Sequence, residues 1–141
     1  MPIVSAAGVL ESLMLLVIQE PSGNFGPRIR KELFKAPNLV VRASKSGKME
    51  KRHLADFYCD VYFPTAGDNT ALLVDSWPVF ADITLLDKAN IEKKEMDFAM
   101  IPAGTTGMIQ PFDVYGFRPW KCFFRHIEDH VALYDLPVVL H

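Results

Sequence analysis

The chain has 141 residues, of which 50% are hydrophobic and 23% are charged; this composition is typical of one folded domain and excludes a disordered chain. The formal net charge of −2 excludes a strongly basic protein, so a nucleic-acid partner would have to be recognised by a local concentration of charge. The longest apolar run, residues 13–18, is too short to span a membrane.

The beginning of the chain predicts strands. Residues 2–6 and 12–20 are expected to form two strands joined by a turn near Gly8, and residues 39–43 are rich in β-branched side chains and predict a third. Residues 21–27 form a loop, because glycine and proline dominate them. Residues 1–17 are largely apolar, but we do not expect them to form a signal peptide, because they have no basic segment and no clear cleavage site and Glu11 interrupts them.

Two helices are expected among these strands. Residues 28–34 predict a short helix, and a loop follows at residues 44–47. Residues 49–62 predict a longer helix, because large apolar side chains recur at helical spacing and form one face: Leu54, Phe57, Tyr58, Val61 and Tyr62.

The second half of the chain alternates strands with helices. Residues 71–74 form a continuous apolar run, which is typical of a strand buried on both faces, and residues 98–101 predict another short strand. Residues 83–95 are weakly helical, and residues 102–111 predict a polar loop. An aromatic helix is expected from Asp113 into the His126 region, with a kink at Pro119. Residues 136–141 are compatible with either a strand or a tail.

This order of elements indicates a mixed α/β sheet with antiparallel strands at its beginning. Asp75 follows the apolar run directly, and the ends of buried strands are where open α/β sheets place their sites. If residues 98–101 lie beside residues 71–74, the next loop can return Asp113 to Asp75. Two converging carboxylates repel each other unless a cation such as Mg²⁺ neutralises them. The alternative is structural: Asp75 caps a turn, and Asp113 begins a helix.

Two motifs favour the metal-binding interpretation. Residues 72–77 (LLVDSW) and 101–113 (IPAGTTGMIQPFD), followed by a helix with Phe117, Trp120, Lys121 and Phe124, resemble the DDE-type transposase core of the pogo and Tigger group. Further segments look similar to transposon-derived relatives, namely residues 3–6, 19–23, 25–27 and 43–48. The resemblance thus covers about residues 1–125 and leaves residues 126–141 as a helix end and tail.

The resemblance implies a ribonuclease H-like fold, DNA as partner, and Mg²⁺ or Mn²⁺ held by Asp75 and Asp113 as the second and third family carboxylates. The strand that carries the first carboxylate in the family has no counterpart here, and residues 78–80 replace a usual Gly-His pair. We therefore expect a nuclease-derived domain that lacks efficient cleavage. Loss of a central strand would also expose sheet edges and favour self-association.

A basic cluster lies upstream of these motifs. Residues 28–52 contain nine of the fifteen basic residues but only two acidic ones, which gives a local charge of about +7. Such a cluster can bind phosphates, or it can simply keep the surface soluble. Its members are Arg28, Arg30, Lys31, Lys35, Arg42, Lys45, Lys48, Lys51 and Arg52.

Two interpretations of the function remain open. In the first, the domain binds nucleic acid; in the second, it is a domesticated protein-interaction or structural fragment with no nucleic-acid role. Cys59 and Cys122 are too few for a disulfide framework and favour an intracellular protein, in the nucleus or the cytoplasm. Cys122, His126 and His130 share a helical face and could form a zinc half-site, although surface or packed histidines are the commoner explanation of such a pattern.

Overall fold

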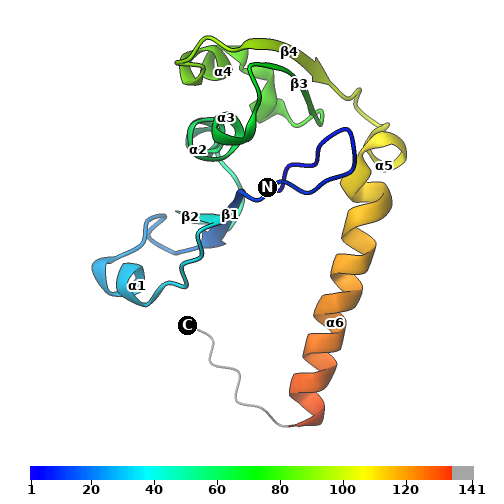
Figure 1. The fold of residues 1–141 in the computed structure, drawn as a ribbon. Helices are drawn as coiled ribbons and strands as arrows, with labels where there is room; N and C mark the ends of the chain where they lie inside the picture. Colours follow the sequence, from blue (N-terminus) through cyan, green and yellow to red (C-terminus); the bar gives the residue numbers. More distant parts are fainter. Residues whose placement is uncertain (135–141) are drawn as a thin grey trace. The chain divides into compact units, whose positions relative to one another are not determined.

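The computed structural model describes residues 1–134 and has a mixed α/β fold, as the sequence predicts (Figure 1). The chain forms two compact units. The first unit comprises Met1–Leu72 and Trp77–Phe98, and the second comprises Leu73–Ser76 and the chain from Ala99 onward. The expected strand or tail at residues 136–141 lies outside the described residues. No described helix has the length and apolar character needed to cross a membrane.

The first sheet has two strands, β1 (Met14–Gln19) and β2 (Leu39–Ser44). They pair in parallel, with Met14 opposite Leu39 and Gln19 opposite Ser44. The expectation of antiparallel strands is therefore wrong for this pair. The connection between the strands contains α1 (Pro27–Glu32) and is long enough for the crossover that parallel strands need.

The expected strand at residues 2–6 is also wrong. The structure has a single antiparallel bridge there, between Val4 and Leu10, around the predicted turn at Gly8. Gly8 has a φ of 79°, and its N–H donates to the carbonyl of Ser5 at 2.9 Å. This segment is a short turn with too few paired residues to form a ladder.

The helix expected at residues 49–62 begins as α2 (Lys51–Phe57) and continues as a π-helical segment, η1 (Tyr58–Tyr62), and as α3 (Phe63–Thr65). Its predicted apolar face is confirmed, because all five side chains are buried. The face packs against α4 (Ile83–Ala89) and the 3-10 helix η2 (Pro78–Ala81), which contribute further buried side chains to this core: Leu86, Ala89 and Phe80.

A second sheet joins β3 (Asn69–Val74) and β4 (Glu95–Met100). The N–H of Glu95 donates to the carbonyl of Asp68 at 2.9 Å, and that of Ile101 to the carbonyl of Val74 at 2.8 Å, so these strands also run parallel. The apolar run is not buried on both faces as expected, because Leu73 is 57% exposed while Leu72 and Val74 are buried. The strands thus form two two-stranded sheets instead of the single mixed sheet expected.

The helix expected at residues 83–95 ends early for a local reason. The side chain of Asn90 accepts from the N–H of Lys94 and donates to its carbonyl, both at 2.8 Å, which turns the chain after Ala89. The ammonium of Lys94 then donates to the carbonyls of Phe63 and Ala66 at the end of α3. These bonds direct the following residues into β4 rather than into more helix.

The second unit contains α5 (Thr106–Ile109), the π-helical η3 (Phe112–Gly116) and α6 (Phe117–Leu133). The loop expected at residues 102–111 thus includes a short helix. The predicted aromatic helix is confirmed. Pro119 lies inside the continuous helical segment that η3 and α6 form, and it has no N–H to donate to the preceding turn. The side chains of Trp120, Phe123 and Phe124 on α6 are exposed.

Tyr58 makes the first unit sensitive to alkaline pH. Its side chain is 0% exposed and its hydroxyl has no hydrogen-bond partner among the described residues. Burial, followed by the charges of Tyr62 and Asp82, raises the pKa of Tyr58 to about 12. An unfolded tyrosine has a pKa of about 10, so above pH 10 only the unfolded chain loses this proton, and the free energy of unfolding falls by about 1.4 kcal/mol per pH unit until pH 12.

We therefore predict that Tyr58→Phe reduces the loss of stability between pH 8 and pH 11, measured by urea unfolding followed by tryptophan fluorescence. At pH 8 the variant should match or exceed the original protein, because it lacks a buried hydroxyl without a partner. The exposed Tyr115 provides the control, Tyr115→Phe. An alkaline loss as large in Tyr58→Phe as in this control would contradict the prediction.

Candidate nucleic-acid interface

Two cations of the basic cluster, Lys45 and Lys48, lie in the turn after β2. The hydroxyl of Ser44, which is fully buried, donates to the carbonyl of Lys48 at 2.8 Å and closes the turn. Gly47 has a φ of 71°, and a Cβ at this position would meet the Cβ of Gln19 at 3.2 Å, so glycine is required there. The turn places Lys45 and Lys48 beside the end of β1.

His53 attaches α2 to this strand end. The ring is buried; its Nδ1 accepts the backbone N–H of Glu50 at 3.0 Å, and its Nε2 lies 3.0 Å from the carbonyl of Ala43. A carbonyl only accepts, so Nε2 carries the hydrogen and the imidazole is neutral. The bond from Glu50 also completes a capping box at the start of α2.

Arg52 binds the same strand end from its exposed side. Its guanidinium donates to the carbonyls of Ala43 and Gly23 at 2.9 and 3.0 Å, and to the side-chain oxygen of Asn24 at 3.3 Å. It also pairs with Glu50 at 2.9 Å. Arg52 therefore connects β2, α2 and the loop after β1, and most of its donors are occupied.

Three further cations of the cluster are held in ion pairs. Arg42 pairs with Asp56 at 2.7 Å and with Asp60 at 2.6 Å, which attaches β2 to α2 and η1. Lys51 pairs with Asp82 at 2.5 Å, and this hydrogen bond, together with one from Thr84, lowers the pKa of the Asp82 carboxyl. Arg28 pairs with Glu32 within α1.

The other five cations are exposed, and none forms an ion pair with any residue that the structure describes. Two of them follow β2 and three lie in or just after α1. Their positive charge is consequently available to a ligand. The five cations are Arg30, Lys31, Lys35, Lys45 and Lys48.

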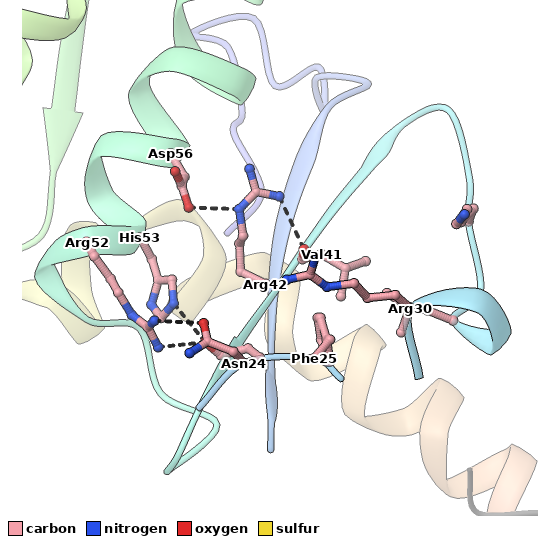
Figure 2. A pocket seen from close by; sticks show the side chains of 11 residues that line it. Asn24, Phe25, Arg30, Val41, Arg42, Arg52, His53 and Asp56 are labelled. Carbon is pink, nitrogen blue, oxygen red and sulfur yellow. Dashed lines mark hydrogen bonds and ion pairs between the residues drawn. The ribbon is translucent and has the colours of Figure 1, made fainter. Parts of the chain in front are cut away.

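A pocket of about 500 Å³ opens among α1, β2 and α2, and Figure 2 shows its lining. Four cations line it, with Asp56 as the opposing carboxylate; Arg30 extends toward the strand, and Arg42 bonds to Asp56. Phe25, Leu33 and Val41 give the pocket an apolar wall. The cations are Arg30, Lys35, Arg42 and Arg52.

The two predicted carboxylates both belong to the second unit. Asp75 is half-buried directly after β3, where Ile101 at the end of β4 is hydrogen-bonded to Val74. Asp113 is exposed in the first turn of η3, with its backbone N–H bonded to the carbonyl of Gln110. The strand-end and helix-start positions are thus those expected, and the closeness of the carboxylates remains a prediction.

Both residues offer the oxygen atoms that Mg²⁺ and Mn²⁺ bind, and neither side chain is fully buried. Among residues 1–134, no three His, Cys, Asp or Glu side chains gather closely enough to hold a metal ion. Cys122, His126 and His130, the zinc half-site considered above, are exposed on α6.

The sequence did not distinguish the cations that hold the fold from those that are available. It also missed His53, which shares the carbonyl of Ala43 with Arg52, and Asp56, which pairs with Arg42. A signal was present, since a polar residue three positions after Glu50 has the spacing of a capping box.

Comparisons with protein-family models, with curated proteins and with solved structures found no match to this chain.

We predict that Asp75 and Asp113 share one divalent cation. Paramagnetic Mn²⁺, added to ¹⁵N-labelled protein, should broaden the amide signals around both residues together. Asp75→Asn should remove the broadening around Asp113, and Asp113→Asn the broadening around Asp75, because each carboxylate alone binds the ion too weakly. Asp129→Asn, an exposed change on α6, serves as the control. Broadening around one site that survives loss of the other carboxylate would refute the shared site.

Proposed function

We propose that this chain binds nucleic acid through contacts with phosphates, with little dependence on base sequence. The observation that supports this function best is the set of five exposed cations in residues 30–48 that form no ion pair within residues 1–134. They lie on one compact unit, and two of them, Arg30 and Lys35, line a pocket together with Arg42 and Arg52. Phosphate contacts of this kind supply most of the affinity of sequence-independent binding.

We further propose that the domain derives from a DDE-type transposase core with a ribonuclease H-like ancestry, and that it acts in the nucleus. Support comes from the motif at residues 101–113 and from Asp75 at the end of β3, beside the end of β4. Asp75 and Asp113 would be the residues that hold Mg²⁺ or Mn²⁺. When bound, such an ion would neutralise these carboxylates and attract a phosphate to them.

On this proposal the chain does not cleave DNA efficiently. Phosphodiester cleavage by two metals needs several fixed carboxylates that flank the reacting phosphate. Asp75 and Asp113 are the two residues that match the family motif, and residues 78–80 differ from its usual Gly-His pair. Positioning errors alone remove orders of magnitude in rate.

A second candidate is a protein-interaction role without nucleic acid. The exposed aromatic side chains of α6 favour it, because large exposed apolar groups that gather on one element are typical of contact surfaces. The two candidates differ in a simple property: binding through phosphates weakens steeply as salt rises, whereas binding through an apolar surface does not.

We predict that the protein binds an arbitrary DNA duplex at low salt, measured by fluorescence anisotropy. The plot of log affinity against log salt should be linear. Replacing Lys45 and Lys48 by glutamine should reduce its slope by about two, since each phosphate contact contributes about 0.9. Lys88→Gln with Lys93→Gln is the matched control, because these lysines are exposed and lie outside the cluster.

Two outcomes would favour the protein-interaction role instead. One is the absence of duplex binding at low salt. The other is duplex binding that does not weaken as salt rises, because binding through an apolar surface has little salt dependence.

A further inference from the structure

The pocket beside β2 combines unequal charges with an apolar wall. Four cations and one carboxylate line it, so the lining carries a net charge of about +3 by simple addition of formal charges. Arg30 and Lys35 form no ion pair with any described residue, so they supply its available charge. An anion in the pocket can pair with these two groups.

The other two cations are partly occupied. Arg42 uses one N–H toward each of Asp56, Asp60 and the carbonyl of Val41, and a guanidinium has five, so it retains free donors. Arg52 holds the loop after β1 through its bonds to Gly23 and Asn24. These two arginines therefore shape the pocket and add positive potential.

The apolar wall has no use in binding a bare phosphate. Phe25 is half-buried and stands on the loop that Arg52 holds, with Leu33 and Val41 also in the lining. An aromatic ring beside cations is the arrangement on which proteins stack the unpaired bases of single strands. A base within a duplex is already stacked on its neighbours and cannot reach such a ring.

We propose that this pocket binds one nucleotide unit, with its phosphate on Arg30 and Lys35 and its base against Phe25. The nucleotide belongs either to a single strand of nucleic acid or to a free mononucleotide, and the chemistry of recognition is the same. In the single-strand form the inference rests on the proposed function. The volume of about 500 Å³ suits one nucleotide, within the usual range of small-molecule pockets.

The first test measures a fluorescent oligothymidylate by anisotropy, with pyrophosphate and thymidine monophosphate as competitors. Arg30→Gln with Lys35→Gln should weaken oligonucleotide binding roughly tenfold to a hundredfold, because two charge-assisted hydrogen bonds are lost. Lys31→Gln with Lys48→Gln removes the same charge outside the pocket and should weaken it only severalfold. Equal losses in the two double variants would overturn the proposal.

The second test concerns the base. Phe25→Leu keeps an apolar side chain and should weaken the oligonucleotide roughly fivefold or more, since stacking contributes about 1–3 kcal/mol per base, while pyrophosphate binding stays unchanged. Phe34→Leu is the matched control, because Phe34 is 75% exposed and does not line the pocket. Equal oligonucleotide binding by Phe25→Leu and Phe34→Leu would overturn base recognition, and with it the proposal.

A third variant should act in the opposite direction. Asp56→Asn removes the negative charge from the lining and should tighten oligonucleotide binding severalfold. Asp60→Asn breaks the other ion pair of Arg42, outside the pocket, and should give a smaller gain in affinity. Equal gains would contradict the assignment.

Tighter binding of the oligonucleotide than of the monophosphate identifies a strand as the source, and equal binding identifies a free nucleotide.

Failure of this proposal can be told apart from failure of the proposed function. If the pocket variants behave like their controls while the duplex still binds in a salt-dependent way, only the pocket is wrong. If the original protein binds no duplex at low salt but still binds thymidine monophosphate through Phe25 and Arg30, the pocket stands and the proposed function fails.

Discussion

The carbonyl of Ala43 accepts hydrogen bonds from both His53 and Arg52, and the first unit depends on this junction. It lies near the end of β2, and the two donors are neighbours at the start of α2. A strand end and a helix start are thereby held in one geometry. Loss of the His53 ring would remove the acceptor of the Glu50 N–H, and loss of Arg52 would remove the donor to the carbonyl of the buried Gly23; a buried polar group left without a partner costs about 1–3 kcal/mol.

The junction also determines which charges remain available. Arg52 is bonded to the loop after β1, and Arg42 on the neighbouring strand position is paired with carboxylates of α2 and η1. Such half-exposed pairs add little stability by themselves. Their effect is to hold Arg42 and Arg52 in fixed positions in the pocket lining, together with Arg30 and Lys35.

Local pattern predicted much of the fold. The buried face of α2 and η1 followed from apolar spacing, and β2 followed from its β-branched residues. The direction of strand pairing could not be predicted this way, because it depends on contacts between segments that are distant in the sequence. β1 and β2 pair in parallel across a long connection, which local pattern does not reveal. The early end of α4 depends on the bonds between Asn90 and Lys94, which helical periodicity does not reveal.

The candidate site was predictable only in composition. The density of lysine and arginine in residues 28–52 was plain, but Arg52 and Lys48 look equivalent in sequence, and only the fold brings Glu50 and two carbonyls to the former. The same limit applies to the carboxylates. The positions of Asp75 and Asp113 at element ends followed from local pattern, whereas their separation depends on the path of the chain between them.

The junction at Ala43 is tested most directly by measuring both unfolding and oligonucleotide binding of His53→Ala. This change removes no formal charge from the neutral ring, yet it deletes one buried and one partly buried hydrogen bond and leaves a cavity. We predict a loss of about 2–4 kcal/mol in the free energy of unfolding, together with weaker binding at temperatures where the variant is still folded. His126→Ala, on an exposed face of α6, should change neither quantity. Unchanged stability and binding in His53→Ala would contradict the account.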